Sequence, residues 1–265
     1  MNAPAPARRP ITRWRASAVH LMCSATLAAL AGMLLFGVWY PQPFTKAAGA
    51  DRLIVLLIGI DLVLGPLLTL IVYKNGKKGM WFDLVFIACV QVAALVYGLN
   101  MIAKQRPIFV VVSDRMTFLT PAGALSEEDL EKAEPALRRR SWTGPLIVAA
   151  PSPTDRKERD DLLFASLAGK DIDRSPHYFR DFSVAGPALV KASAPLADLE
   201  RIPAAAAEVS AFVERHGVPL GQLRFQALRG RDPELDSTVV FNLADASIVG
   251  VIDVDPWLAD APKKH

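Results

Sequence analysis

One aspartate lies inside a long hydrophobic run, where a carboxylate is costly to place. The run, from Leu53 to Tyr73, reads LIVLLIGIDLVLGPLLTLIVY, and Asp61 is its only charged residue. In a helix that rises about 1.5 Å per residue, Asp61 lies roughly 12 Å inside the nearer end. A carboxylate at that depth in a bilayer costs roughly 2.5–3.5 kcal/mol on insertion scales, and such residues normally face protein or water. We therefore expect Asp61 to serve helix packing or a functional contact.

Asp61 shares one face of this predicted helix with Gly65 and Thr69, because each follows the last by four residues. In a later run, Gln91 is within one helical turn of Asp61 in height, so the two could hydrogen-bond. These four residues are predicted to pack helices together or to bind a partner's membrane helix, and the two interpretations weigh about equally. A proton pathway is less favoured, because the interior of the spans offers no second acid, and we place His20 at the membrane interface.

Three hydrophobic runs are long enough to cross a bilayer as helices, over about residues 17–39, 53–73 and 82–103. Lys and Arg are concentrated in the arm 1–15 and in the loop 74–80. The positive-inside rule places both segments in the cytoplasm. We therefore expect a cytoplasmic basic arm over 1–15, a three-helix transmembrane domain over 16–106 and an extracytoplasmic domain over 107–265. The first run exceeds the 7–15 apolar residues of a signal peptide, so we expect it to stay as an anchor.

The charge is divided unevenly along the chain. Residues 1–106 carry 11 Lys/Arg against 3 Asp/Glu, whereas residues 107–265 carry 19 against 24. The overall charge of +3 therefore averages a basic membrane part and an acidic extracytoplasmic part. Because the basic excess is explained by membrane orientation, we expect no nucleic-acid partner.

Residues 107–265 predict an α+β domain with a mainly antiparallel sheet. Short β-rich runs flank Ser113-Asp114, which is interpreted as a hairpin or a bend between strands. A capping box is predicted at Ser126, and Thr154 is predicted to cap a charged helix that ends near Leu167. The segment 169–187 is predicted to be irregular. The other predicted elements are strands over 145–150, 222–229, 237–243 and 247–254 and helices over 195–201 and 204–215, the last ended by Gly217.

This domain offers little that could act as an enzyme. It lacks the HExxH, G-x-S-x-G, P-loop and G-x-G-x-x-G patterns, and its histidines are His177, His216 and His265. Both cysteines, Cys23 and Cys89, lie in hydrophobic runs, which excludes disulfides and cysteine-based zinc sites from the domain. We therefore expect no catalytic residues, no metal and no cofactor.

Several short motifs follow one another in order over about residues 12–119. They are Trp14-Arg15-Ala16-Ser17 with His20-Leu21, Val38-Trp39-Tyr40-Pro41, Gly59-Ile60-Asp61, the string LGPLLTLIV from Leu64 to Val72, Phe82-Asp83-Leu84, Gln91-Val92-Ala93-Ala94-Leu95, Tyr97-Gly98-Leu99 and Arg106-Pro107. In this order they resemble the TfpX/TfpZ family of type IV pilin accessory proteins. The resemblance is weak beyond residue 119, and Met116 stands where the family pattern leads us to expect phenylalanine.

The resemblance implies a multi-pass protein of the bacterial inner membrane, with its C-terminal domain in the periplasm. Such a protein stabilises or chaperones a type IV pilin, with the major pilin as the expected partner, and supports pilus assembly. It would bind the pilin membrane helix and the periplasmic head, and inner-membrane lipids would surround its helices. From the residues alone, the alternative is a membrane sensor with a ligand-binding periplasmic domain, although the short cytoplasmic segments leave little room for an output domain. A membrane-bound hydrolase comes third, because we find no active site.

Overall fold

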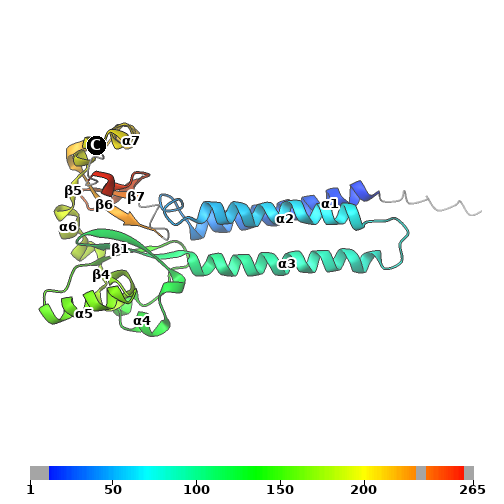
Figure 1. Cartoon of the computed structure of the whole chain (residues 1–265), viewed down its shortest axis with the longest axis horizontal. Coiled ribbons are helices and arrows are strands. Elements are labelled where there is room, and N and C mark those ends of the chain that lie inside the picture. Colours follow the sequence, from blue (N-terminus) through cyan, green and yellow to red (C-terminus); the bar gives the residue numbers. More distant parts are fainter. Residues whose placement is uncertain (1–11, 231–236, 260–265) are drawn as a thin grey trace, which may run out of the picture. The chain divides into compact units, whose positions relative to one another are not determined.

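The computed structural model describes residues 12–230 and 237–259, and the chain divides into two compact units. The helical unit comprises the described part of 1–37 together with 52–102, and the sheet unit comprises 38–51 and the residues from 103 onward. Figure 1 shows the elements of both units, coloured along the sequence. Most of the predicted basic arm, residues 1–11, and His265 lie outside the described residues.

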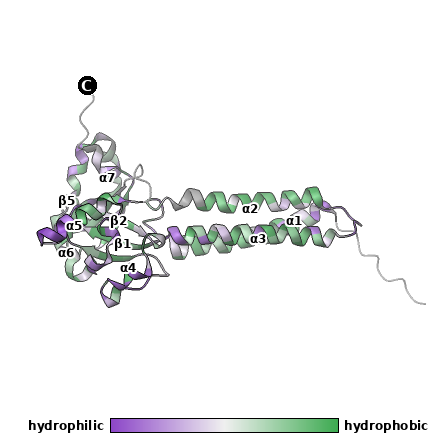
Figure 2. Cartoon of the chain, turned by 60° about the horizontal axis from the view of Figure 1, so that its bottom comes forward, coloured by the Kyte–Doolittle hydropathy of each residue, from purple (hydrophilic) through white to green (hydrophobic). Residues whose placement is uncertain are grey.

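The helical unit is built from three long helices. They are α1 (Arg13–Leu34), which continues as a π-helical turn over Leu35–Trp39, α2 (Ala50–Val72) and α3 (Met80–Gln105). The spans Arg13–Trp39, Ile54–Val72 and Met80–Gln105 are each long and apolar enough to cross a membrane. Figure 2, a cartoon coloured by the hydropathy of each residue, shows that hydrophobic residues predominate along these helices. The prediction of three apolar spans is therefore confirmed.

The sheet unit contains an eight-stranded sheet in the order β4-β3-β1-β2-β6-β7-β8, with β5 paired to β6. The strands are β1 (Pro107–Ser113), β2 (Met116–Pro121), β3 (Leu146–Ala150), β4 (Arg180–Asp181), β5 (Ala194–Pro195), β6 (Leu223–Arg229), β7 (Ser237–Asn242) and β8 (Ile248–Ile252). The antiparallel hairpin β1–β2 lies in the middle, and each of its strands has a parallel neighbour on the other side, β3 or β6.

These two parallel pairings correct the prediction of a mainly antiparallel sheet, because the sheet is mixed. Parallel strands need a long crossover connection. Helical segments supply it, since α4 (Glu127–Glu131) precedes β3, and α5 (Arg156–Leu167), α6 (Phe182–Ala192) and α7 (Pro203–His216) precede β6. The predicted hairpin, the strand at 145–150 and the three final strands are confirmed.

The helix boundaries follow local capping. Ser126 forms the predicted capping box with Asp129, and α7 ends at Gly217, whose φ of 65° is left-handed. The charged helix α5 is capped by Asp155, which corrects the prediction of Thr154. The segment predicted to be irregular contains the start of α6, where the Asp181 side chain accepts a hydrogen bond from Ser183 N.

The sheet unit has two hydrophobic core clusters. Strand β1 is buried along its whole length and contributes to the first, in which Phe109 and Phe179 meet edge to face at 5.2 Å. The second cluster packs α7 against the other end of the sheet. Its fully buried members include Leu196, Leu199, Val209, Leu223 and Val240. A strand with buried residues on both faces reads as a continuous apolar run, as IFVVV in β1 does.

Candidate functional site

A chain of hydrogen bonds connects the three helices of the helical unit. The His20 ring on α1 lies between two partners, with Nδ1 2.5 Å from Thr69 Oγ1 on α2 and Nε2 2.6 Å from Gln91 Oε1 on α3. The Gln91 amide nitrogen donates to the main-chain oxygen of Asp61 at 3.1 Å. Interhelical bonds in membranes are worth about 0.6 kcal/mol on average. This chain of hydrogen bonds therefore mainly determines which faces of the helices pair, and it adds little to their stability.

Glycines allow the helices to approach closely at two points. A Cβ atom at Gly65 would collide with the Gln91 amide group, and one at Gly98 would collide with the Leu57 side chain. Small residues at helix contacts favour close packing in membranes, where dispersion rather than the hydrophobic effect drives association. The Gly65 contact places Gln91 directly beside α2, where it can reach the Asp61 carbonyl oxygen.

Beside this chain of bonds, the three helices form a cavity of about 120 Å³. Its lining residues are His20, Cys23, Ser24, Leu27, Ala28, Ile58, Asp61, Ala88, Gln91, Val92 and Leu95. We call this cavity the Asp61 groove. At its border, Leu27 and Val92 are 44% and 50% exposed, so the groove reaches the surface of the unit. The half-buried Asp61 carboxyl group forms no hydrogen bond or ion pair with another residue that the structure describes.

The structure brings all four predicted site residues, Asp61, Gly65, Thr69 and Gln91, into one contact region. Gln91 bonds to the main chain of Asp61, which leaves the carboxyl group itself open toward the groove.

Two further residues of this region were not found from the sequence. His20, which was predicted to lie at the membrane interface, was not expected to join helices, yet it is half-buried and bridges α2 and α3. Ser17 donates a hydrogen bond to Pro66 O at 2.8 Å. Their spacing of three residues on α1, which places both on one helix face, is the signal that could have indicated a shared contact.

The sheet unit holds a second cluster of polar and aromatic groups, which we call the Trp–Arg cluster: Trp39, Arg106, Arg140 and Trp142. The rings of Trp39 and Trp142 meet edge to face at 5.6 Å, and the Arg106 guanidinium lies over both, 5.5 and 4.8 Å from their centroids. Arg106 is buried and donates to Ser141 O at 3.2 Å. Burial, together with the nearby positive charge of Arg140, lowers the pKa of Arg106.

Three N–H donors of this cluster are buried and have no acceptor among the described residues. They are Trp39 Nε1, Arg106 Nε and Arg140 Nε. Arg140 uses another nitrogen to bond Leu125 O at 2.8 Å and to pair with the exposed Glu127 carboxylate at 3.0 Å. A buried donor without a partner costs about 1–3 kcal/mol. The cluster therefore has more hydrogen-bond donors than acceptors and more positive than negative charge among the described residues.

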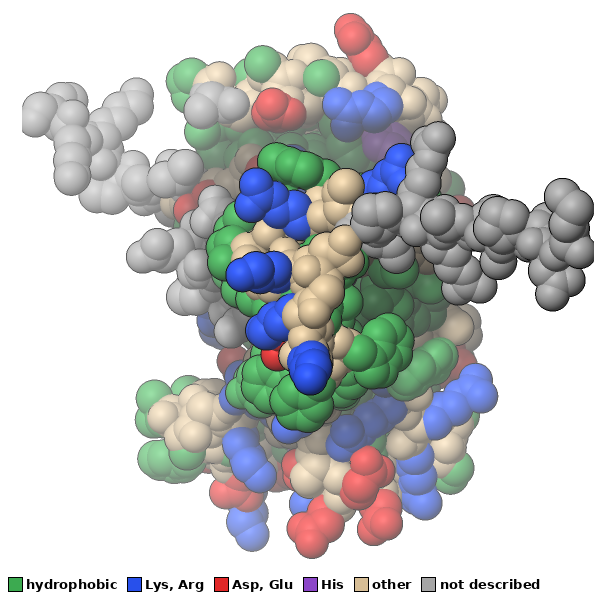
Figure 3. All heavy atoms as spheres, turned by 90° about the vertical axis from the view of Figure 1, so that its right-hand side faces the viewer, with side chains coloured by type: hydrophobic (Ala, Val, Ile, Leu, Met, Phe, Trp, Pro, Cys, Tyr) green, Lys and Arg blue, Asp and Glu red, His purple; other side chains and the backbone are tan. Residues whose placement is uncertain are grey.

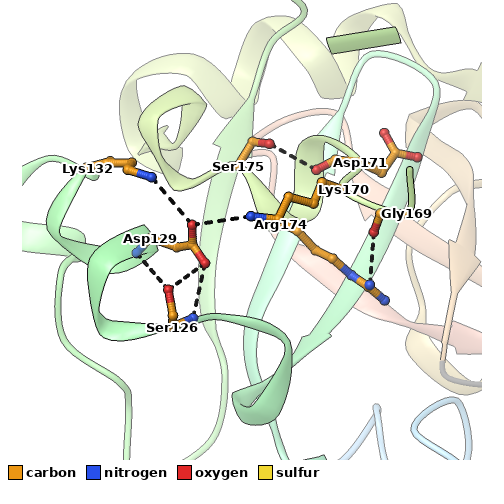
Figure 4. A network of polar contacts seen from close by, with 8 residues as sticks. All are labelled: Ser126, Asp129, Lys132, Gly169, Lys170, Asp171, Arg174 and Ser175. Carbon is orange, nitrogen blue, oxygen red and sulfur yellow. Dashed lines mark hydrogen bonds and ion pairs between the residues drawn. The ribbon is translucent and has the colours of Figure 1, made fainter. Parts of the chain in front are cut away.

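A third polar network has a structural role. Figure 4 shows the Asp129 carboxylate of α4 accepting hydrogen bonds from the Ser126 main chain and hydroxyl, at 3.2 and 2.7 Å. Lys132 and Lys170 lie 3.6 and 4.0 Å from the same carboxylate. These bonds lower the pKa of Asp129, the two from Ser126 most. The network joins the start of α4 to the segment after α5.

The remaining titratable groups of the sheet unit are dispersed. Asp173 is 8% exposed, and its burial raises the pKa to about 6, although Thr120 Oγ1 lies 3.4 Å from its carboxylate oxygen. His177 contacts Tyr178, and His216 packs on Phe212 at the end of α7. Within residues 12–230 and 237–259, no three His, Cys, Asp or Glu side chains gather in a way that could hold a metal ion.

Comparison with known proteins gives a consistent set of matches. Residues 8–49 match the model of the fimbrial assembly protein FimB. Two proteins of Dichelobacter nodosus match over 184 residues, which is 68% of this chain and 71% of each relative. They are the fimbrial assembly protein of serogroup I, 34% identical, and that of serogroup E1, 32% identical.

A third fimbrial assembly protein of the same organism, from serogroups C1 and C2, is 38% identical over 115 residues. This match covers 42% of the chain and 88% of the relative. No solved structure matches the chain.

Proposed function

The chain belongs to the FimB family of fimbrial assembly proteins, and on this basis we propose that it stabilises or chaperones a type IV pilin during pilus assembly. In this proposal the helical unit binds the membrane helix of the pilin, and the sheet unit binds the head that the pilin exposes outside the membrane. The role is one of binding rather than catalysis, and the expected partner is the major pilin.

The Asp61 groove is the observation that carries this proposal. A carboxylate inside a membrane span is tolerated when it faces protein, water or a polar partner. His20, Thr69 and Gln91 are occupied with one another, whereas the Asp61 carboxyl group lines the groove with no bond to a described residue. A fourth helix in the groove could bring a hydrogen-bond donor to Asp61 and cover the exposed side chains at its border.

The outer faces of the helices also support a partner within the membrane. In the most apolar stretch of each candidate span, only 6% to 22% of the residues are buried. Three helices therefore leave broad apolar faces that lipid or a further helix must cover. The small side chains of Ala28 and Ala88 in the groove make room for close approach of another helix.

For the head of the pilin, the surface of α5 offers a contact. Leu163, Phe164 and Leu167 are 59%, 69% and 79% exposed on this one helix. Large apolar groups that gather on a surface are typical of interaction sites. We assign this face of α5 to the pilin head.

The proposed orientation rests on the distribution of basic side chains. In Figure 3, Lys and Arg side chains gather on the near end of the helical unit. Arg13 and Arg15 begin α1, and Lys74, Lys77 and Lys78 lie in the connection from α2 to α3. Basic residues are enriched on the cytoplasmic side of membrane proteins. We therefore propose an inner-membrane protein with a cytoplasmic N-terminus and a periplasmic sheet unit.

The proposal can be tested by photocrosslinking in cells that assemble pili. A photoreactive amino acid at Leu27 or Val92, which border the groove, should yield an adduct with pilin. The same amino acid at Val63, 61% exposed on α2 but outside the groove, is the matched control and should yield little. Equal labelling at all three positions, or none at any, would contradict the groove as the binding site.

Asp61 is tested separately through pilin abundance. Asp61→Asn keeps a polar side chain of the same size, whereas Asp61→Leu replaces it with an apolar side chain. We expect Asp61→Leu to lower both the groove crosslink and the cellular pilin level, with Asp61→Asn between it and the wild type. Unchanged pilin levels and adducts in both variants would show that Asp61 does not contact the pilin.

A further inference from the structure

We propose that the Trp–Arg cluster of the sheet unit binds the phosphate of an anionic phospholipid headgroup. This site is separate from the Asp61 groove, and the inference does not depend on the pilin-binding role. It rests on where the cluster lies in the sequence, on its charge and on its buried donors.

The cluster lies at the ends of two candidate membrane spans. Trp39 is the last residue of the first span, and Arg106 directly follows Gln105, the last residue of the third. Tryptophan is enriched where a membrane meets water, and arginine near a span end reaches the headgroups. The covalent structure alone therefore keeps both side chains near the headgroup layer of any membrane that these spans cross.

The charge of the cluster is not balanced. Arg106 donates to the main-chain oxygen of Ser141, the residue that follows Arg140, and the positive charge of Arg140 disfavours that of Arg106. Glu127, which pairs with Arg140, is 78% exposed at its side chain. Arg138 and Arg139 precede Arg140 in the chain. The cluster is thus a basic site in a part of the chain where acids outnumber bases 24 to 19.

The buried donors suit a phosphate. Arg106 is 8% exposed, yet its Nε has no acceptor among the residues that the structure describes. The buried atoms Arg140 Nε and Trp39 Nε1 likewise have none there. A phosphodiester carries one negative charge and several acceptor oxygens, and guanidinium groups recognise such oxygens in a planar, two-pronged geometry. Basic sites beside membrane helices bind lipid headgroups in this way.

We assign to Trp142 the control of access of the headgroup to the two arginines. Its ring contacts both Trp39 and Arg106 but is 60% exposed, and in this proposal it moves aside to admit the headgroup. A headgroup phosphate then reaches Arg106 and Arg140 while the two indole rings remain at the membrane surface. The environment of Trp142 changes on binding, which makes this residue a reporter.

The test uses the purified full-length protein in detergent micelles, titrated with short-chain phosphatidylglycerol. Binding is followed by tryptophan fluorescence and by the number of lipids retained in native mass spectrometry. We expect saturable binding of one lipid, and loss of most of the fluorescence change in Trp142→Phe. Inorganic phosphate and short-chain phosphatidylcholine, the free anion and a lipid without net charge, should bind at least about tenfold more weakly.

Substitutions at two neighbouring arginines, Arg139 and Arg140, distinguish a defined binding site from a diffuse basic surface. Arg140→Gln should weaken lipid binding roughly tenfold, the loss expected for a charge-assisted hydrogen bond. Arg139→Gln removes the same charge from an exposed side chain and should leave the affinity within about twofold. Arg106→Lys keeps the charge but loses the planar fork, and should weaken binding even when the fold is intact by circular dichroism.

The proposal is overturned if Arg139→Gln and Arg140→Gln weaken binding equally, which would indicate a diffuse basic surface. It is also overturned if inorganic phosphate binds as tightly as the lipid, which would indicate a site for a free anion. Absence of lipid binding by the wild type overturns it as well.

Discussion

Two glutamine side chains, one in each unit, connect segments that are far apart in the sequence. On α3 of the helical unit, half-buried Gln91 joins His20 and the Asp61 carbonyl oxygen. On β6 of the sheet unit, Gln226 is 4% exposed, accepts from Thr117 at 2.8 Å and donates to two further oxygens at 3.0 Å.

The two glutamines show that the surroundings determine how much the hydrogen bonds of an amide group contribute to the free energy of unfolding. Gln226 is almost completely buried in the folded sheet unit, whereas water would hydrate every one of its partners in the unfolded chain. In a membrane, the separated helices find other partners for their polar groups, so an interhelical bond adds little. We therefore expect polar contacts to govern stability in the sheet unit and to govern helix pairing in the helical unit.

The largest effect is expected for Gln226→Leu. The substitution leaves Thr117 Oγ1, Ser113 O and Ser193 Oγ without their shared partner. At about 1–3 kcal/mol for each buried unsatisfied group, the free energy of unfolding should fall by about 4 kcal/mol. Urea unfolding followed by far-UV circular dichroism measures the change. Gln222→Leu, at an exposed position, is the control and should cost less than about 0.5 kcal/mol. Similar losses in both variants would contradict the role of Gln226.

The second prediction concerns a buried acid of the sheet unit. The pKa of Asp173 is about 6 in the folded chain, above its ordinary value of 3.8. The folded state therefore binds the proton more tightly, and stability falls as the pH rises from about 4 to about 6. Above that window the ionised group costs about 3 kcal/mol, since one pKa unit corresponds to about 1.4 kcal/mol.

Asp173→Asn should remove this cost, so the variant should be more stable than the wild type at pH 7.5 and equal to it at pH 3.5. Thermal unfolding at several pH values measures the difference. Asp160→Asn on the exposed face of α5 is the control, because a substitution of an exposed side chain should change the stability by less than about 0.5 kcal/mol. A variant that is less stable than the wild type at pH 7.5 would show that the charge of Asp173 is needed in the fold.

The third prediction returns to the helical unit, where packing rather than hydrogen bonding should dominate. Gly65→Leu places a side chain where the Gln91 amide lies, and overpacking of this kind costs about 2 kcal/mol. Gly59→Leu on the same helix is the matched control, because a Cβ atom there meets no heavy atom within 4 Å. Thermal unfolding in detergent should separate the two variants. Equal melting temperatures would mean that α2 and α3 do not approach at Gly65.

The smallest effect is expected for Gln91→Leu. It removes both interhelical bonds of the amide, but the free energy of unfolding should fall by only about 1 kcal/mol. Leu keeps a similar volume, so the change isolates the polar contribution. The measurement is unfolding in the same detergent as for Gly65→Leu. A loss as large as that of Gln226→Leu would overturn the contrast between the two units.

Most of the elements could be predicted from the sequence because they follow local rules. Three apolar runs predicted the three long helices, and the hairpin β1–β2 follows from two β-rich runs around Ser113-Asp114. The partners of these elements could not be predicted. The pairing of β3 with β1 depends on the path of the connection that contains α4, which local sequence does not determine. The strands β4 and β5 are only two residues long and are defined by their pairing with β3 and β6.

The candidate site shows the same division. The spacing of Asp61, Gly65 and Thr69 predicted a shared helix face, and the helix rise predicted that Gln91 lies at a similar height. The role of His20 was missed because its spacing from Ser17 indicates a shared helix face but not which residues lie opposite that face. Its partners are 49 and 71 residues away and become neighbours only when three helices pair.

The Asp61 carbonyl oxygen gives the hydrogen-bonded chain a fixed polarity. A carbonyl group can only accept, so Gln91 must present its nitrogen to α2 and its oxygen to His20. Neutral His20 then carries its proton on Nε2, which donates to Gln91, and its Nδ1 accepts a hydrogen bond from the Thr69 hydroxyl group. One main-chain atom thus selects a tautomer, an amide orientation and a hydroxyl rotamer on three different helices. A helix that slipped by one residue along its axis would move its own groups out of hydrogen-bonding distance, so these bonds also fix the vertical register of the three helices.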